Sequence, residues 1–293
     1  MSQNHRNRPI AASSNGNENP FELTHYQLVP RRHYGRMALA AVIAGAVAGV
    51  IHAFANGQIE WAYVQQYLTA RAIMFGALNT IILAALAMLL GIAIGVTTAL
   101  MRLSRNPLLR YGAIFYIWLF RGTPLVLQLL LWFNLALIFP RIGIPGLVHV
   151  DTVILMTPFV AALLGLGINQ GAYTAEVVRA GLLSVGPGQY DAAKSIGMPR
   201  LQALRRIIVP QAMRFIIPPV GNEAISMVKM TSLASVLQYA ELLHNAQNIY
   251  YANARVIELL IVAGAWYLAV VTVLSLGQSR LERCFAGAAG PCS

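Results

Sequence analysis

Charged residues are scarce in this 293-residue sequence. Asp, Glu, Lys and Arg make up 11% of it, whereas an ordinary soluble domain carries about 25%. Hydrophobic residues make up 57%. This composition excludes an ordinary soluble domain and predicts an integral membrane protein.

Cysteine and lysine are scarcer still, and their positions exclude several kinds of site. Cys284 and Cys292 both lie near the C-terminus, which suggests neither a disulfide framework nor a zinc site, and the six histidines have no metal-ligand spacing. A nucleotide-binding P-loop needs a glycine before its lysine, and neither Lys194 nor Lys229, the only lysines, follows one. No polar stretch is long enough for a nucleotide-binding domain. We therefore expect no cofactor, metal or ATP hydrolysis in this chain.

The apolar residues fall into long runs that predict an all-α membrane fold. Residues 1–36 form a polar tail that we expect to be disordered, and the first 30 residues lack the apolar region and cleavage site of a signal peptide. Beyond it, six segments are long enough to cross about 30 Å of hydrocarbon. They span approximately 37–55, 73–100, 112–138, 152–174, 215–238 and 256–277.

The basic residues predict the orientation of these spans. With the N-terminus and C-terminus in the cytoplasm, 16 of the 21 Lys and Arg residues face inward. Only Arg71, Arg141 and Arg255 then face outward, and Arg121 and Lys229 fall within spans. The net charge of +11 is thus mainly a topology signal. Because it is spread over several short loops, we do not expect nucleic-acid binding.

Residues 189–210, between the fourth and fifth spans, are the most informative stretch. Tyr190, Ala193 and Gly197 share one side of a short predicted helix, and Gly197 can adopt the left-handed conformation that ends it. A second helix is predicted from about Pro199 to Val209. Such a helix–turn–helix knob could dock into a groove on another protein. The alternative is a basic loop that rests on anionic lipid.

The spacing within this stretch resembles the cytoplasmic coupling loop of bacterial ABC importer permeases. That loop has the pattern E-A-A, three residues, G, nine residues, I-x-L-P, and here Asp191 replaces the Glu and Val209 replaces the Leu. The resemblance implies that the loop at 183–214 binds an ATPase subunit. The residues that match or flank the pattern, and would make this contact, are Gln189, Tyr190, Asp191, Ala192, Ala193, Gly197 and Pro210.

Charges within the predicted spans suggest a polar route. Placing one charged side chain at the centre of the bilayer costs roughly 2.5–3.5 kcal/mol of insertion free energy, so Arg121 and Lys229 would together cost about 5–7 kcal/mol if they faced lipid. They should therefore face a cavity, a partner or a helix end. Glu223 precedes Lys229 by six residues, too far around a helix for a direct pair. Either these charges are paired internally and stabilise packing, or they line a pathway for solute.

Other segments resemble one subfamily, the permeases of polar amino acid ABC importers. The segment 120–125 with Gln128 looks like its R-G-T-P-L segment, and 222–223, 229–233 and 172–179 fit its later helices. The resemblance covers 70–285 and implies a core of five spans, so that residues 37–56 look like an added N-terminal helix. The pathway residues that it implies are Arg121, Thr123, Gln128, Asn222, Glu223, Lys229 and Ser232.

The same resemblance implies a set of partners. These are a second permease subunit, identical or homologous, two ATPase subunits that use ATP and Mg, and an extracytoplasmic binding protein that delivers an amino acid. The protein would lie in the bacterial inner membrane as a multi-pass permease and would not itself be an enzyme.

Glycine and proline predict breaks and close contacts in the spans. Gly122 and Pro124 should break the third span, and Pro218–Pro219 should disturb the start of the fifth, although simple kinks are the alternative. The pairs Gly45/Gly49 and Gly91/Gly95 could allow close helix packing.

Two other classes of function remain open. A transporter coupled to H⁺ or Na⁺ could use Glu223 and Lys229 as an ion relay, but it would need no docking loop. A membrane enzyme could use His149 and Asp151, which lie together in an outward loop but lack a nucleophile or metal partner in recognisable spacing.

Overall fold

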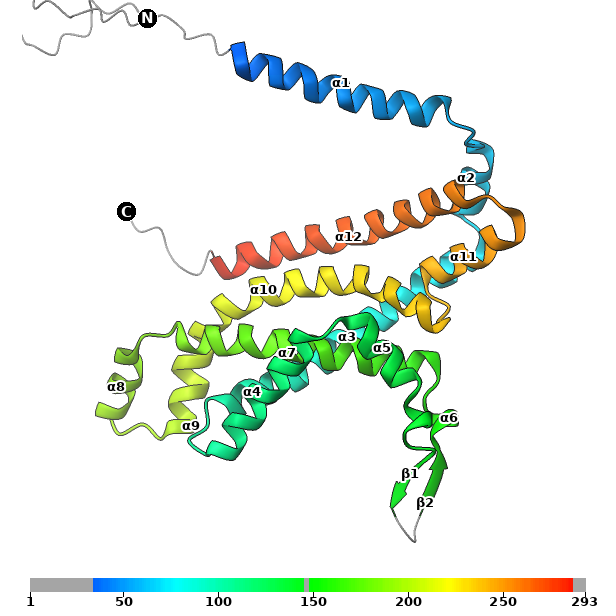
Figure 1. Cartoon of the computed structure of the whole chain (residues 1–293). Coiled ribbons are helices and arrows are strands. Elements are labelled where there is room, and N and C mark those ends of the chain that lie inside the picture. The colour runs from blue at the N-terminus through cyan, green and yellow to red at the C-terminus, as the bar shows by residue number, and fades with distance from the viewer. Residues whose placement is uncertain (1–33, 145–147, 287–293) are drawn as a thin grey trace, which may run out of the picture. The chain divides into compact units, whose positions relative to one another are not determined.

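The computed structural model describes residues 34–144 and 148–286, which are helical almost throughout (Figure 1). The chain divides into two units after Gln58. The first contains α1 (Tyr34–Asn56), 23 residues long and apolar along its whole length. It corresponds to the predicted N-terminal helix at 37–56 but begins three residues earlier. Residues 1–33 of the predicted tail lie outside the described residues.

The second unit contains the remaining elements, and its helices confirm the predicted all-α membrane fold. Its α-helices are α2 (Trp61–Leu68), α3 (Arg71–Arg102), α4 (Pro107–Gly122), α5 (Leu125–Phe133), α6 (Thr152–Leu155), α7 (Pro158–Leu183), α8 (Pro187–Ser195), α9 (Arg200–Ala203), α10 (Val209–Met230), α11 (Leu242–Asn253) and α12 (Val256–Ala286). Short 3₁₀ segments cover Leu135–Leu137 (η2) and Thr231–Leu237 (η4), and a π turn covers Leu204–Ile208 (η3). An antiparallel hairpin pairs β1 (Arg141–Ile144) with β2 (Val148–Asp151), with Arg141 opposite Asp151.

Glycines bring α3 and α7 into close contact at the centre of this unit. A Cβ atom added at Gly91 would lie 2.7 Å from Cγ of Gln170, and one added at Gly95 would lie 2.7 Å from Cβ of Thr174. Only glycine fits at both positions, so the predicted packing role of this pair is confirmed. The Gly45/Gly49 pair of α1 stays a prediction.

Three helices among the described residues are long and apolar enough to span a membrane by themselves, namely α1, α3 and α12. The bent pair of α4 and α5 adds a fourth if it counts as one span. Helices α7 and α10 have 26 and 22 residues, long enough at about 1.5 Å per residue to cross the hydrocarbon core. Both carry polar residues in their middle and therefore fall below the apolarity of the other spans.

The predicted helix at 199–209 does not end there, which corrects the sequence-based boundary. Helix α9, the π turn and α10 follow one another without a gap from Arg200 to Met230. Pro210 has no N–H to donate to the preceding turn, and the wider turn at Leu204–Ile208 absorbs this defect. Pro218 and Pro219 lie inside α10 and do not interrupt it. The carbonyl of Pro218 accepts an additional hydrogen bond from Gln278 Nε2 of α12 at 3.3 Å.

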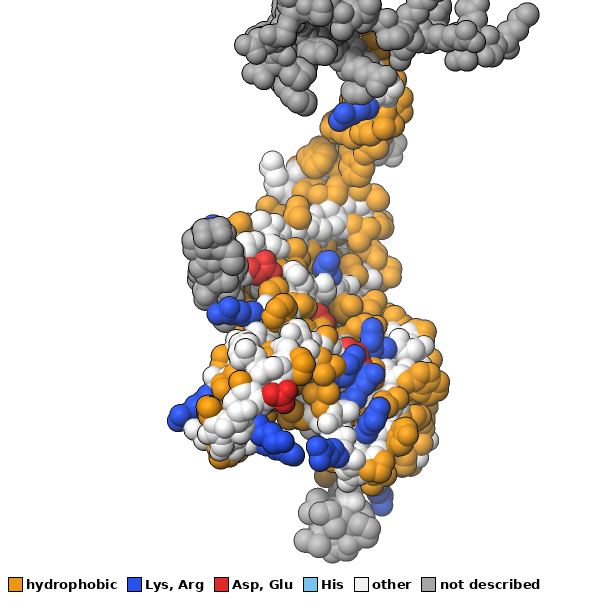
Figure 2. All heavy atoms as spheres, turned by 90° about the vertical axis from the view of Figure 1, so that its left-hand side faces the viewer, with side chains coloured by type: hydrophobic (Ala, Val, Ile, Leu, Met, Phe, Trp, Pro, Cys, Tyr) orange, Lys and Arg blue, Asp and Glu red, His pale blue; other side chains and the backbone are white. Residues whose placement is uncertain are grey.

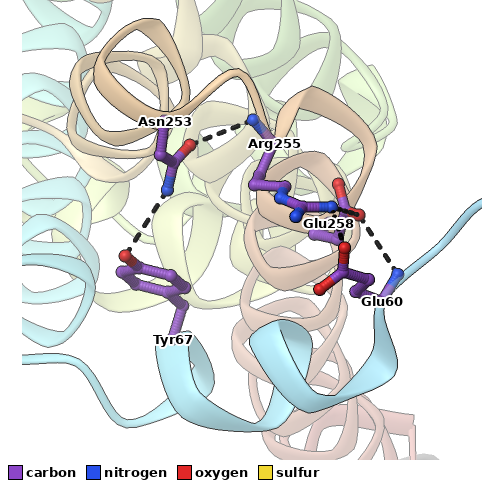
Figure 3. Close-up of polar contacts among 5 residues, drawn as sticks. All are labelled: Glu60, Tyr67, Asn253, Arg255 and Glu258. Carbon is purple, nitrogen blue, oxygen red and sulfur yellow. Dashed lines mark hydrogen bonds and ion pairs between the residues drawn. The ribbon is translucent and has the colours of Figure 1, made fainter.

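Polar contacts fasten α2 to the turn between α11 and α12 (Figure 3). Arg255 forms ion pairs with Glu60 and, at 3.8 Å, with Glu258. The backbone N–H of Glu60 donates to Glu258 Oε1 at 3.2 Å. Asn253 accepts from the N–H of Arg255 and donates to the hydroxyl of Tyr67. We call Glu60, Arg255 and Glu258 the α2 clamp.

Candidate functional site

The predicted docking stretch forms α8 and the turn after it. The N–H of Gly197 donates to the carbonyl of Lys194, and the N–H of Met198 donates to that of Ala193, both at 3.0 Å. This is the Schellman arrangement, which requires a left-handed residue at Gly197. Gly197 has φ +71°, so its predicted conformation is confirmed. Side chains other than hydrogen are strained at such an angle.

Helix α8 exposes most of its surface and buries one small side chain. Ala193 is buried against the domain, whereas Tyr190, Asp191 and Lys194 are exposed. Tyr190 and Ala193 lie three positions apart in α8 and therefore share one side of it, as predicted, but of the two only Ala193 is buried. The other predicted coupling residues are also exposed, namely Gln189, Ala192, Gly197 and Pro210. Gln211 of α10 donates a hydrogen bond to Gln189 at 3.2 Å, which joins the two sides of the loop.

The loop rests on an apolar cluster that joins the long helices. Val185, Ile208 and Ala212 are buried together with Ala99 of α3. Helix α8 follows α7 after three residues, and the run from α9 into α10 has no gap. A displacement of α8 would therefore act directly on two of the long helices.

Basic side chains gather on the face of the domain that carries α8 (Figure 2). Exposed members from four different segments are Arg105, Arg110, Lys194, Arg200, Arg205, Arg206, Arg280 and Arg283. Such a face suits an acidic protein surface or anionic lipid.

The predicted break between α4 and α5 is confirmed. The two helices meet at a bend of 102°, and Thr123 and Pro124 between them have extended backbone. Gln128 Nε2 donates to the carbonyl of Phe120 at 3.0 Å and to that of Thr123 at 3.1 Å. Asn169 of α7 also donates to the Phe120 carbonyl, at 2.8 Å, and to Gln128 Oε1 at 3.1 Å. The side-chain amides thus replace the hydrogen bonds that the break removes.

Gln128 and Thr123 consequently support the break. Both are hydrogen bonded within the chain, and Gln128 is buried. Asn169 has the same role but was missed in the sequence. The adjacent polar residues Asn169 and Gln170, in the middle of a predicted span, were the signal that could have identified it.

Arg121 and Lys229 both lie at helix ends, one of the three expected locations. Arg121 is in the last turn of α4 and Lys229 in the last turn of α10. A cation there interacts favourably with the C-terminal end of the helix dipole. The Arg121 guanidinium lies 5.0 Å from the ring centre of Tyr173, which allows a cation–π contact. Lys229 is exposed.

Glu223 is held by two side chains of α7. Its Oε2 accepts from Gln170 Nε2 at 2.7 Å and from Thr174 Oγ1 at 3.0 Å. The expectation that it does not pair directly with Lys229 agrees with these contacts. Asn222 is exposed, and Ser232 donates to the carbonyl of Lys229. Asn222, Lys229 and Ser232 thus make no described contact with the Glu223 cluster.

Helix α7 joins the two parts of the predicted pathway. Asn169 contacts the break and Tyr173 contacts Arg121, while Gln170 and Thr174 hold Glu223. These four residues occupy six consecutive positions of one helix. A cavity of about 740 Å³ begins beside Thr174 and continues past Val178 and Leu182, with mainly apolar walls from α3, α10 and α12.

The structure gives no support to His149 and Asp151 as the catalytic pair of a membrane enzyme. Asp151 forms an ion pair with Arg141 across the hairpin at 3.2 Å, and the side chain of His149 lies outside the described residues. In the part of the chain that was searched, no three His, Cys, Asp or Glu residues group as metal ligands do.

Comparison with known proteins identifies a family. Residues 91–285 match the description of the "Binding-protein-dependent transport system inner membrane component" family. The arginine transport system permease protein ArgU of Corynebacterium glutamicum is 41% identical over 259 residues, which cover 87% of this chain and 82% of that protein. The L-cystine transport system permease protein TcyB of Bacillus subtilis is 37% identical, with 77% and 91% covered.

A solved structure resembles the chain in both fold and sequence. The crystal structure of an amino acid ABC transporter with histidines contains a chain that is 34% identical and superimposes with a TM-score of 0.67. The similarity covers 77% of the present chain and 99% of the solved one.

Proposed function

We propose that this chain carries a polar amino acid across the membrane. It belongs to the family of binding-protein-dependent transport system inner membrane components and is a permease subunit of an ABC importer. The observation that carries the proposal is the Schellman turn at Gly197, which ends an exposed helix joined to α7 and α10. An ATPase bound to α8 could move both long helices at once. The relatives named for arginine and cystine support an amino acid as the solute.

The transport cycle would be alternating access. Two ATPase subunits bind ATP with Mg, close, and carry the α8 helices of two permease subunits together, whether these are identical or homologous. The permease helices then open toward an extracytoplasmic binding protein, accept the amino acid and release it inward after hydrolysis. No step requires a cofactor bound to this chain.

The pathway would follow the polar side of α7. Arg121, beside Tyr173, offers a positive group for a carboxylate, and Glu223, held by Gln170 and Thr174, offers a negative group for an ammonium. Asn222, Lys229 and Ser232 would contribute polar groups along α10 and the segment after it. Gln128 and Thr123 would act indirectly, because their hydrogen bonds hold the break that positions Arg121.

The α8 end would face the cytoplasm, with both termini on that side. The exposed basic residues of four segments gather at this end, whereas Arg71, Arg141 and Arg255 lie in the predicted outward parts of the chain. This asymmetry follows the positive-inside rule.

Reconstitution tests the proposal against the ion-coupled alternative. The permease, its ATPase and a saturated binding protein are placed in liposomes, and uptake of radiolabelled arginine and of cystine is measured with and without internal ATP. We expect accumulation only with ATP, unchanged by an ionophore. Uptake that continues without ATP and collapses with the ionophore would establish a secondary transporter instead.

A further inference from the structure

A pocket of about 350 Å³ at the α8 end of the second unit is lined largely by arginine. It lies at the turn between α3 and α4 and next to α7. No carboxylate is among its lining residues, which are Arg102, Leu103, Ser104, Arg110, Ile114 and Arg179.

The pocket has more positive charge than its surroundings neutralise. Glu176 forms ion pairs with both Arg102 and Arg179, so one carboxylate serves two guanidinium groups. Arg110 is exposed, and no ion pair is found for it within the described residues. Three arginines against one nearby glutamate leave a surplus that a bound anion could satisfy. Guanidinium groups suit phosphate because they present paired N–H donors in one plane.

The depth of the pocket matches that of lipid headgroups. Arg102 is the last residue of α3, a 32-residue apolar span. Asn106, which caps α4 through the N–H of Leu108, begins the return into the next apolar helix. The pocket therefore lies where the hydrocarbon region ends, and this is where phosphate groups of lipids are found.

One wall of the pocket continues as an apolar surface. Leu103 is 42% exposed and Ile114 37% exposed. Above them, the outer side of α4 presents large apolar side chains, with Phe115 59% and Trp118 67% exposed. A free phosphate ion would gain nothing from such a wall, whereas an acyl chain would lie along it.

We propose that Arg102, Arg110 and Arg179 bind the phosphodiester headgroup of an anionic phospholipid, whose acyl chain follows the outer side of α4. The site is separate from the coupling helix and from the residues of the amino acid pathway. It depends neither on the orientation of the chain nor on the solute that it carries, so its failure would leave the proposed function intact.

Titration with short-chain lipids tests the site on the purified full-length chain in detergent. Dioctanoyl phosphatidylglycerol, dioctanoyl phosphatidylcholine and inorganic phosphate are each titrated, and bound ligand is counted by native mass spectrometry. We expect saturable binding of phosphatidylglycerol, weaker binding of phosphatidylcholine and no displacement of the lipid by equimolar phosphate. Displacement by phosphate would overturn the assignment to lipid and indicate a free-anion site.

Matched variants separate this pocket from general surface charge. Arg110→Gln should weaken phosphatidylglycerol binding about fivefold, as expected for one basic residue near a lipid surface. Arg110→Lys should retain most of it. Arg105→Gln removes an equal charge from the same turn, outside the pocket, and should have no effect. Equal losses in the two Gln variants, or none in either, would refute the site.

Two further measurements exclude indirect effects. Arg110 is exposed, so the melting temperature of Arg110→Gln should equal that of the wild type. If the variant unfolds early, Ile114→Asn provides the second test, since it should weaken lipid binding by removing the apolar wall. Loss of ATPase association in Arg110→Gln, with lipid binding unchanged, would assign the pocket to the protein partner and overturn the proposal.

Discussion

The two ends of the second unit use arginine in opposite ways. In the α2 clamp, one arginine forms ion pairs with two glutamates, Glu60 just before α2 and Glu258 of α12 (Figure 3). At the α8 end, a single glutamate, Glu176, serves two arginines, and further basic side chains stay exposed around it (Figure 2). The first arrangement satisfies its charges within the chain. The second leaves positive charge available to other molecules. The α2 end is therefore stabilised by its own ion pairs, whereas the α8 end is suited to binding a partner.

Removal of the coupling helix should have the largest effect and would break the contact-making end. Deletion of residues 190–200 should release the ATPase completely, because it removes most of α8 and its turn. Co-purification from membranes measures this. A matched change at the hairpin, Arg141→Ala with Asp151→Ala, should leave the ATPase bound. Stoichiometric ATPase on the deletion variant would show that the docking assignment is wrong.

Gly197→Val should uncouple transport without removing the loop. No atom lies within 4 Å of an added Cβ there, so the effect is conformational. A left-handed backbone costs a residue with a Cβ about 1–2 kcal/mol, and a change of about 1.4 kcal/mol alters an equilibrium tenfold. We therefore expect transport to fall about tenfold at equal membrane abundance.

The control for this prediction is Gly188→Val in α8, the helix that ends before Gly197. Gly188 also has open space around it, but it lacks the positive φ of Gly197. Uptake and abundance are measured together for both variants. Equal uptake by Gly197→Val and the wild type would mean that the turn is incidental.

Asn169→Leu should affect the region between the two ends. The substitution leaves the buried Oε1 of Gln128 without its donor, which costs about 1–3 kcal/mol of unfolding free energy. Thermal unfolding in detergent measures the loss. Asn134→Leu removes an exposed amide that bonds only within its own turn and should cost less. Equal stability of the two variants would contradict the role given to Asn169.

Arg255→Gln should have the smallest effect and would sharpen the contrast with the α8 end. It removes the cation of the α2 clamp, but the backbone hydrogen bond from Glu60 to Glu258 remains. We expect a slightly lower melting temperature with ATPase association unchanged. Loss of the ATPase from this variant would show that the two ends are not independent.

Local backbone chemistry made several features predictable. Gly197 before Met198–Pro199 specified a left-handed helix end, and Gly122 with Pro124 specified the break that the 102° bend confirms. Proline was a poorer guide in α10, where Pro218 and Pro219 stay within the helix. Helix α10 packs against α7 and α12, and packing by neighbouring helices lets a membrane helix tolerate prolines. Sequence rules failed where helices distant in the sequence pack around the prolines.

By itself, the sequence determined the membrane class, the family, the helix end at Gly197 and the positions of charge within the spans, because these depend on composition and on residues a few positions apart. Only the tertiary structure decided what each polar side chain contacts. Gln170 and Glu223 are 53 residues apart in the sequence, and Glu60 and Glu258 of the α2 clamp are 198 residues apart. Hydrogen bonds and ion pairs need atoms within about 3–4 Å, and helix packing alone brings such distant residues together.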